Sequence, residues 1–151
     1  MLENRISASL TPEDQQAVMA AIATLREKLP FLTDISPEER RSLPKMGDKS
    51  RAFVQKAMEI AQQNEGILPR AFDLEEMRKD VQLAADLYPI LLAIAQLHEL
   101  VDDTYLVVGS EAYAGALLVY NAAKMNNVGG LDDTLDELGK RFARKARGKQ
   151  V

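Results

Sequence analysis

Apolar side chains recur at steps of three and four residues along most of the chain, which is the spacing of one face of an α-helix. No segment alternates apolar and polar residues between turn signals, as a half-buried strand does. The pattern therefore predicts an all-α protein. The expected helices lie at about 12–28, 37–43, 49–63, 74–107, 111–125 and 131–146.

Cap signals support these helix starts. Thr11-Pro12 and Ser36-Pro37 each place a hydroxyl side chain before a proline at the first helical position. Asp48 and Asp73 are the expected caps of the next two helices. In the helix that follows Asp48 we expect a stripe of Phe53, Ala57, Ile60 and Ala61, widened by Val54 and Met58.

The longest expected helix runs over about 74–107. Its apolar residues fall at alternating steps of three and four, as in helices packed along a seam: Leu74, Met77, Val81, Ala84, Tyr88, Leu91 and Ala95. Pro89 lies inside this run and predicts a kink, because an interior proline removes one backbone hydrogen bond. Gly109-Ser110-Glu111 predicts a tight turn that starts the next helix.

These elements together predict a four- or five-helix, mostly antiparallel bundle. A length of 151 residues fits one domain. We expect residues 1–130 to form the bundle and residues 131–151 to add a C-terminal helix with a basic tail in the same domain. Aromatic residues make up 5% of the chain and there is no Trp, so the core is expected to be aliphatic.

Composition excludes several kinds of site. The chain has no cysteine, which removes disulfides, thiolate metal sites and cysteine nucleophiles. Motifs of phosphate-binding loops and hydrolase nucleophiles are also missing, so we expect a non-enzymatic protein without a cofactor. We expect no signal peptide after Met1. The apolar stretch 90–101 contains polar residues and is shorter than the roughly 20 residues of a membrane span, so it is expected to be a buried helix segment of a cytoplasmic protein.

The one histidine supplies the richest polar cluster. His98 and Asp102 are four residues apart, share a helix face and are candidate ligands of a divalent metal. Tyr88 and Tyr105 lie near the same seam, so a ligand pocket of Tyr88, His98, Asp102 and Tyr105 is a second hypothesis. An ion pair between His98 and Asp102 at the edge of the core is the simpler interpretation.

Charge is distributed unevenly along the chain. The net charge is −4, yet six basic residues and no acid lie in 140–151: Lys140, Arg141, Arg144, Lys145, Arg147 and Lys149. This tail could dock on an acidic surface of its own or a neighbouring copy, bind nucleic acid or anionic lipid, or be a solvated terminus. Ala112 and Ala116 form a small-residue face that permits close approach of another helix.

Four short motifs add a resemblance. Residues 43–49 (LPKMGDK), 53–57 (FVQKA), 100–104 (LVDDT) and 109–113 (GSEAY) resemble those of a family of short uncharacterised bacterial all-helical proteins. The resemblance covers roughly residues 11–126. It implies a bacterial helical protein and carries no activity or site.

Three hypotheses for function follow. The first is a non-enzymatic interaction or structural protein that associates with itself or with another protein. The second is a small-molecule or metal-binding bundle that uses the region of His98 and Asp102. The third is peripheral binding to an anionic surface through the basic tail.

Overall fold

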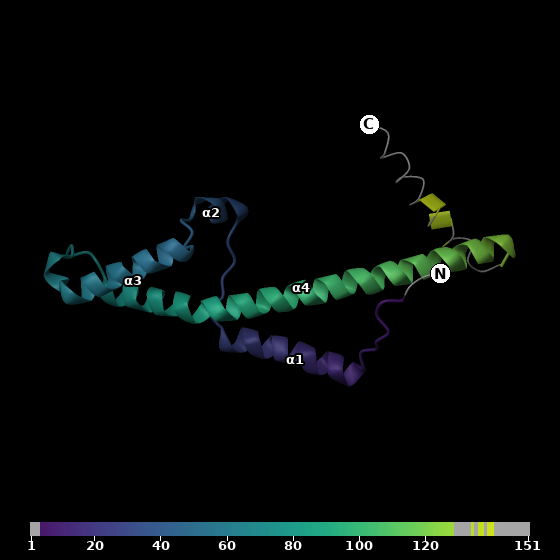
Figure 1. The fold of residues 1–151 in the computed structure, drawn as a ribbon, viewed down its shortest axis with the longest axis horizontal. Helices are drawn as coiled ribbons and strands as arrows, with labels where there is room; N and C mark the ends of the chain where they lie inside the picture. The colour runs from purple at the N-terminus through teal and green to yellow at the C-terminus, as the bar shows by residue number, and fades with distance from the viewer. Residues whose placement is uncertain (1–3, 129–133, 135, 138, 141–151) are drawn as a thin grey trace, which may run out of the picture. The chain divides into compact units, whose positions relative to one another are not determined.

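The computed structural model describes residues 4–128 together with 134, 136, 137, 139 and 140 (Figure 1). All regular structure in this part of the chain is helical, so the all-α prediction is confirmed. The elements are α1 (Pro12–Lys28), α2 (Pro37–Ser42), α3 (Asp48–Gln63), the 3₁₀ turn η1 (Glu65–Ile67) and α4 (Leu74–Met125).

The predicted caps of α1, α2 and α4 are present. The Thr11 hydroxyl accepts a hydrogen bond from the Asp14 backbone at 3.1 Å, and Asp73 Oδ1 accepts one from the Glu76 backbone at 3.0 Å. Ser36 and Glu39 exchange two hydrogen bonds in a capping box. The predicted cap of α3 is wrong by one residue, since Gly47 occupies the cap position and Asp48 is the first helical residue.

The expected turn at Gly109-Ser110-Glu111 is wrong, because α4 continues through it for 52 residues from Leu74 to Met125. A Cβ at Gly109 would meet no neighbouring group within 4 Å, so neither a turn nor the close approach of another segment requires glycine there. One interior glycine costs only about 1 kcal/mol relative to alanine, which a run of good helix formers on both sides outweighs. The helix also continues through Pro89, and the kink there stays a prediction.

The helix ends where a loop is predicted. Asn127 adopts a left-handed conformation (φ 47°), and the Val128 backbone donates to the Ala123 carbonyl at 3.2 Å. This hydrogen bond, which spans six residues, is typical of a Schellman motif at a helix C-terminus. The left-handed position of that motif is usually occupied by glycine and sometimes by asparagine. Positions 134, 136, 137, 139 and 140 are helical, as predicted for the last helix. The rest of 131–146 lies outside the described residues.

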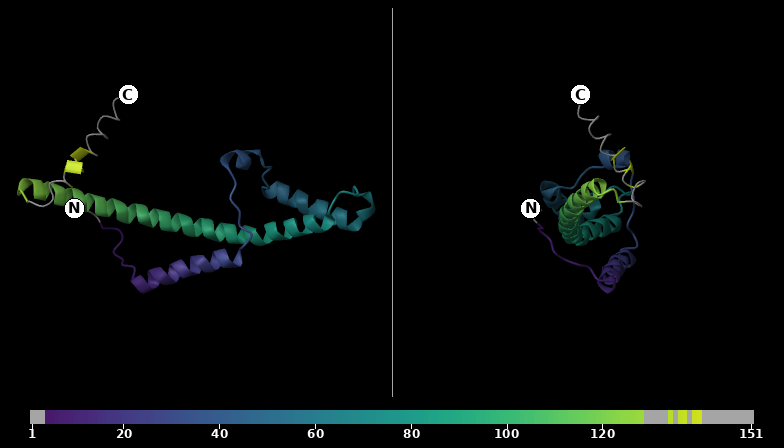
Figure 2. Two further views of the ribbon diagram at one scale, coloured as in Figure 1. Left: turned by 180° about the vertical axis from the view of Figure 1, so that it is seen from behind. Right: turned by 90° about the vertical axis from the view of Figure 1, so that its right-hand side faces the viewer.

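Contacts divide the chain into two units, residues 9–98 and residues 1–8 with 99–151. In the first unit, α3 and the beginning of α4 lie side by side (Figures 1 and 2). Met58 and Ala61 are buried, and Val54 and Ala57 are half-buried. The expected stripe is therefore partly wrong, because Phe53 and Ile60 point outward with 73% and 45% of their surface exposed. The half-buried residues of α4 in this unit are Leu74, Met77, Val81, Ala84, Leu87 and Ile90.

In the second unit the N-terminal segment is tied to α4. The Arg5 backbone N–H donates to Glu111 Oε1 at 2.6 Å. The Asn4 side-chain amide, when oriented to donate, reaches Glu111 Oε2 at 2.8 Å. Ala123 is the buried apolar residue of the described part of this unit.

The described residues hold little core. Met58, Ala61 and Ala123 are its buried apolar side chains. The prediction that the stretch 90–101 is buried is wrong, since every residue from Leu91 to Leu106 is exposed. Helical periodicity predicts that a face will be covered but not by which molecule, which is why this inference failed.

Candidate functional site

The middle of α4 carries several large apolar side chains that are mostly exposed. Leu100 is 66% exposed, Tyr105 75% and Leu106 69%. Scattered exposed apolar residues are normal on a protein surface, whereas a contiguous group marks a binding surface. The contiguous group is therefore the candidate site.

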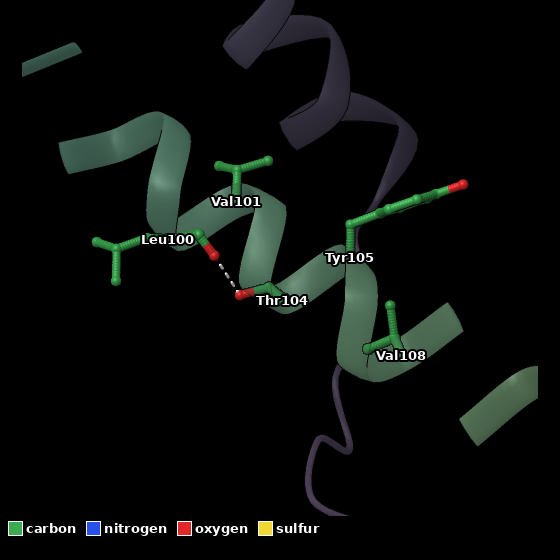
Figure 3. A pocket seen from close by; sticks show the side chains of 5 residues that line it. All are labelled: Leu100, Val101, Thr104, Tyr105 and Val108. Carbon is green, nitrogen blue, oxygen red and sulfur yellow. Dashed lines mark hydrogen bonds between the residues drawn. The ribbon is translucent and has the colours of Figure 1, made fainter. Parts of the chain in front are cut away.

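Five side chains on successive turns line an open hollow of about 340 Å³ along α4. They are Leu100, Val101, Thr104, Tyr105 and Val108, which we call the α4 face (Figure 3). Their spacing of i, i+1, i+4, i+5 and i+8 is that of a wide apolar stripe. The Thr104 hydroxyl donates to the Leu100 carbonyl at 2.7 Å, so its hydrogen-bonding need is met within the helix.

Acidic side chains stand beside the α4 face. Successive helical residues are about 100° apart, so the face spans about 140° from Leu100 to Tyr105. By the same geometry Asp103 lies about 60° outside the Leu100 edge and Asp102 about 60° outside the Tyr105 edge, with Glu99 behind both. All three carboxylates are exposed. The surface is therefore an apolar strip whose N-terminal end is bordered by negative charge.

This arrangement suits a helix better than a small molecule. Ligand pockets enclose most of their ligand, with polar groups converging on it. The hollow on α4 is lined by residues of a single helix, and Tyr105 is the one lining residue with a phenol group. An elongated apolar strip is instead the complement of the apolar stripe on another helix.

The structure gives Tyr88 a different neighbour from those predicted. The Arg51 guanidinium of α3 lies 3.9 Å from the centre of the Tyr88 ring, and Arg51 also pairs with Asp48. The interaction with Tyr88 is the main cause that raises the pKa of Arg51, and Asp48 adds to it. Ten residues of helix separate Tyr88 from His98, a rise of about 15 Å. Tyr88 therefore joins α3 to α4, and the structure does not bring it together with His98.

His98 and Asp102 are both exposed on α4. Within the described ranges, no group of three or more His, Asp or Glu side chains is placed to hold a metal ion. The metal hypothesis thus rests on the spacing of two residues. The predicted pocket partner Tyr105 lies on the α4 face.

Some of the predicted interaction residues lie among the residues that the structure describes. Ala112 and Ala116 are exposed on α4, and Lys140 is exposed. The other basic residues, Arg141, Arg144, Lys145, Arg147 and Lys149, lie outside the described residues.

Sequence reasoning missed most of the α4 face. It selected Tyr105 as part of a polar pocket and passed over Leu100, Val101, Thr104 and Val108. The signal was available, because the i, i+1, i+4, i+5, i+8 pattern is wider than the a/d seam that was followed through Leu91 and Ala95.

By length and composition α4 could also cross a membrane. An 18-residue window has a mean hydropathy of 1.3 with at most two charged residues, and none of the window is buried. A single helix of this kind is weak evidence for a span.

Comparison with known proteins adds no relative. No family model, curated protein or solved structure matches the chain. The family resemblance of the four short motifs therefore stays a prediction.

Proposed function

We propose that this chain is a non-enzymatic interaction protein that associates with further copies of itself through the α4 face. The observation that carries the proposal is the exposure of every residue from Leu91 to Leu106 on the longest helix, among them the large apolar side chains of Leu100, Val101 and Tyr105. A wide apolar stripe on a helix is stable in a position where other groups cover it.

Burying the exposed apolar side chains of the α4 face would contribute a large free energy for so few residues. Fully burying one leucine, valine or aromatic side chain contributes about 1.5–3 kcal/mol. Leu100, Val101 and Tyr105 each have 60% or more of their surface exposed. Covering these three side chains contributes roughly 3–5 kcal/mol on that scale, enough to decide whether two chains associate.

Protein fits this surface better than lipid does. A membrane span centred on the α4 face would place Glu99, Asp102 and Asp103 near the middle of the bilayer, where each charge costs about 2.5–3.5 kcal/mol. A protein partner can leave these carboxylates at the edge of the contact, in water. On this proposal the chain is a cytoplasmic protein.

Self-association also accounts for the predicted bundle. The four- or five-helix, mostly antiparallel bundle would then be completed by helices of more than one chain. The exposed small residues Ala112 and Ala116 continue along α4 beyond the α4 face, where they permit close approach of a neighbouring helix.

The test compares two exposed aromatic residues. Tyr105→Ser removes the largest side chain of the α4 face, and Phe53→Ser is the matched control because Phe53 on α3 has nearly the same exposure, 73% against 75%. Sedimentation velocity over a hundredfold range of protein concentration measures association of each full-length chain. We expect an oligomer for the unmodified chain and for Phe53→Ser, and at least tenfold weaker association for Tyr105→Ser.

Three results would contradict the proposal. A monomer at every concentration would show that α4 is not covered by a second copy. Equal weakening by the two substitutions would show that association does not depend on the α4 face. Recovery of the unmodified chain in the membrane fraction of cells would show that lipid covers α4.

A further inference from the structure

The α4 face and the C-terminal segment have matching apolar spacing. On α4, Val101, Tyr105, Val108 and Ala112 follow at steps of four, three and four residues. In the C-terminal segment the same steps of four, three and four separate Leu131, Leu135, Leu138 and Phe142. The order of steps is the same in both directions, so the two series can meet in a parallel or an antiparallel pair.

We propose that residues 131–145 of a second copy dock antiparallel on the α4 face, with Phe142 beside Val101 and Leu131 beside Ala112. This inference rests on the self-association proposed above and names the partner element. Leu131 would lie opposite the small Ala112, and Leu138 opposite Tyr105, which is 75% exposed.

Charge selects the antiparallel direction. The C-terminal segment begins with four acids, Asp132, Asp133, Asp136 and Glu137, and continues into the basic run 140–149. An antiparallel pair places Arg141 and Lys145 level with the carboxylates of Glu99, Asp102 and Asp103. A parallel pair places Asp132 and Asp133 level with Asp102 and Asp103 instead, and like charges repel.

The level of Gly139 along α4 favours a second chain over the same chain as the source of the docked segment. A Cβ at Gly139 would lie 3.8 Å from the Tyr120 hydroxyl of its own chain. A helix running back along α4 from that level brings Arg141 level with about residue 118. Sixteen residues then still separate Arg141 from Asp102, a rise of about 24 Å. In that arrangement Arg141 would not reach the acids of its own α4, whereas docking on another copy is free of this restraint.

Charge exchange tests the pairing in full-length chains. Asp102→Arg with Asp103→Arg reverses the acidic side, and Arg141→Glu with Lys145→Glu reverses the basic side. We expect each pair of substitutions to weaken self-association five- to tenfold at low salt, and the chain carrying all four to regain most of it. Glu13→Arg with Asp14→Arg on α1 is the control for the change in net charge, and it should leave association unchanged.

Cross-linking distinguishes docking between chains from docking within one chain. The chain has no cysteine, so Thr104→Cys and Arg141→Cys each introduce a single thiol. A mixture of the two single variants treated with a short bismaleimide should give a heterodimer, and Asp14→Cys mixed with Arg141→Cys should not. A chain with both thiols at 104 and 141 that cross-links within a monomer would overturn the inference.

The remaining outcomes separate the two proposals. Self-association that is lost in Tyr105→Ser, but is unaffected by charge exchange and gives no cross-link from Arg141→Cys, would overturn the docked tail and leave the function standing. A monomer under all conditions would overturn both. Restored association in the fourfold variant together with the heterodimer would support both.

Discussion

Met58 and Phe53 lie five residues apart on α3 and offer a sharp test of which face of that helix is packed. Met58 is 6% exposed and Phe53 is 73% exposed. Replacing a fully buried methionine by alanine costs about 2–5 kcal/mol. Because few residues around Met58 are buried, the site can collapse or admit water, so we expect the low end, about 2 kcal/mol. Phe53 has about a quarter of its surface covered, which limits the cost of Phe53→Ala to under about 1 kcal/mol.

Urea unfolding followed by circular dichroism measures both costs. With a slope of about 2 kcal/mol/M, Met58→Ala should lower the midpoint by about 1 M and Phe53→Ala by less than half of that. Measuring at two protein concentrations separates this effect from association, which makes stability depend on concentration. Equal losses for both substitutions, or a larger loss for Phe53→Ala, would refute the assigned face of α3 and restore the stripe expected from sequence.

Four further predictions test other parts of the structure. Gly109→Ala should raise the free energy of unfolding by about 0.5–1 kcal/mol in chemical denaturation, because the site is mid-helix; a loss would restore the turn. Arg51→Lys should cost about 0.5–1 kcal/mol through weaker stacking on the ring, and nothing in a Tyr88→Leu background if the two residues act as a pair. The pKa of Glu39 is lowered by hydrogen bonds to the backbone and side chain of its N-cap serine. Its contribution to α2 is therefore present above the usual carboxyl pKa of about 4.3 and lost as the pH falls through the lowered pKa. Backbone chemical shifts should report this loss, and the same loss in Glu39→Gln would contradict it. Zn²⁺ should leave the melting temperature unchanged, since no third ligand among the described residues is placed to complete a site with His98 and Asp102; a rise that His98→Ala abolishes would favour the metal hypothesis.

Sequence-based predictions succeed along this chain where a feature depends on a few neighbouring residues, and fail where it depends on more distant ones. Thr11-Pro12 and Ser36-Pro37 predict helix starts because a cap needs only a side-chain oxygen and the next three residues. Gly109-Ser110-Glu111 misleads because the same residues that cap a helix can also lie inside one. Neighbouring residues alone do not distinguish a helix start from a position inside a helix. The length of helix-forming sequence on either side decides which of the two forms.

The candidate site shows the same division. The apolar periodicity of α4 predicts that it has faces to cover, and its pattern of acids predicts where those faces end. The sequence by itself determined the helical class and the capped starts of α1, α2 and α4. Only the tertiary structure decided that Val54, Ala57, Met58 and Ala61 face the packed side of α3, that Tyr88 stacks with Arg51, and that the middle of α4 is exposed. Periodicity is a property of one helix, whereas burial depends on where every other segment lies. The positions of those segments are set by the balance of free-energy terms over the whole chain.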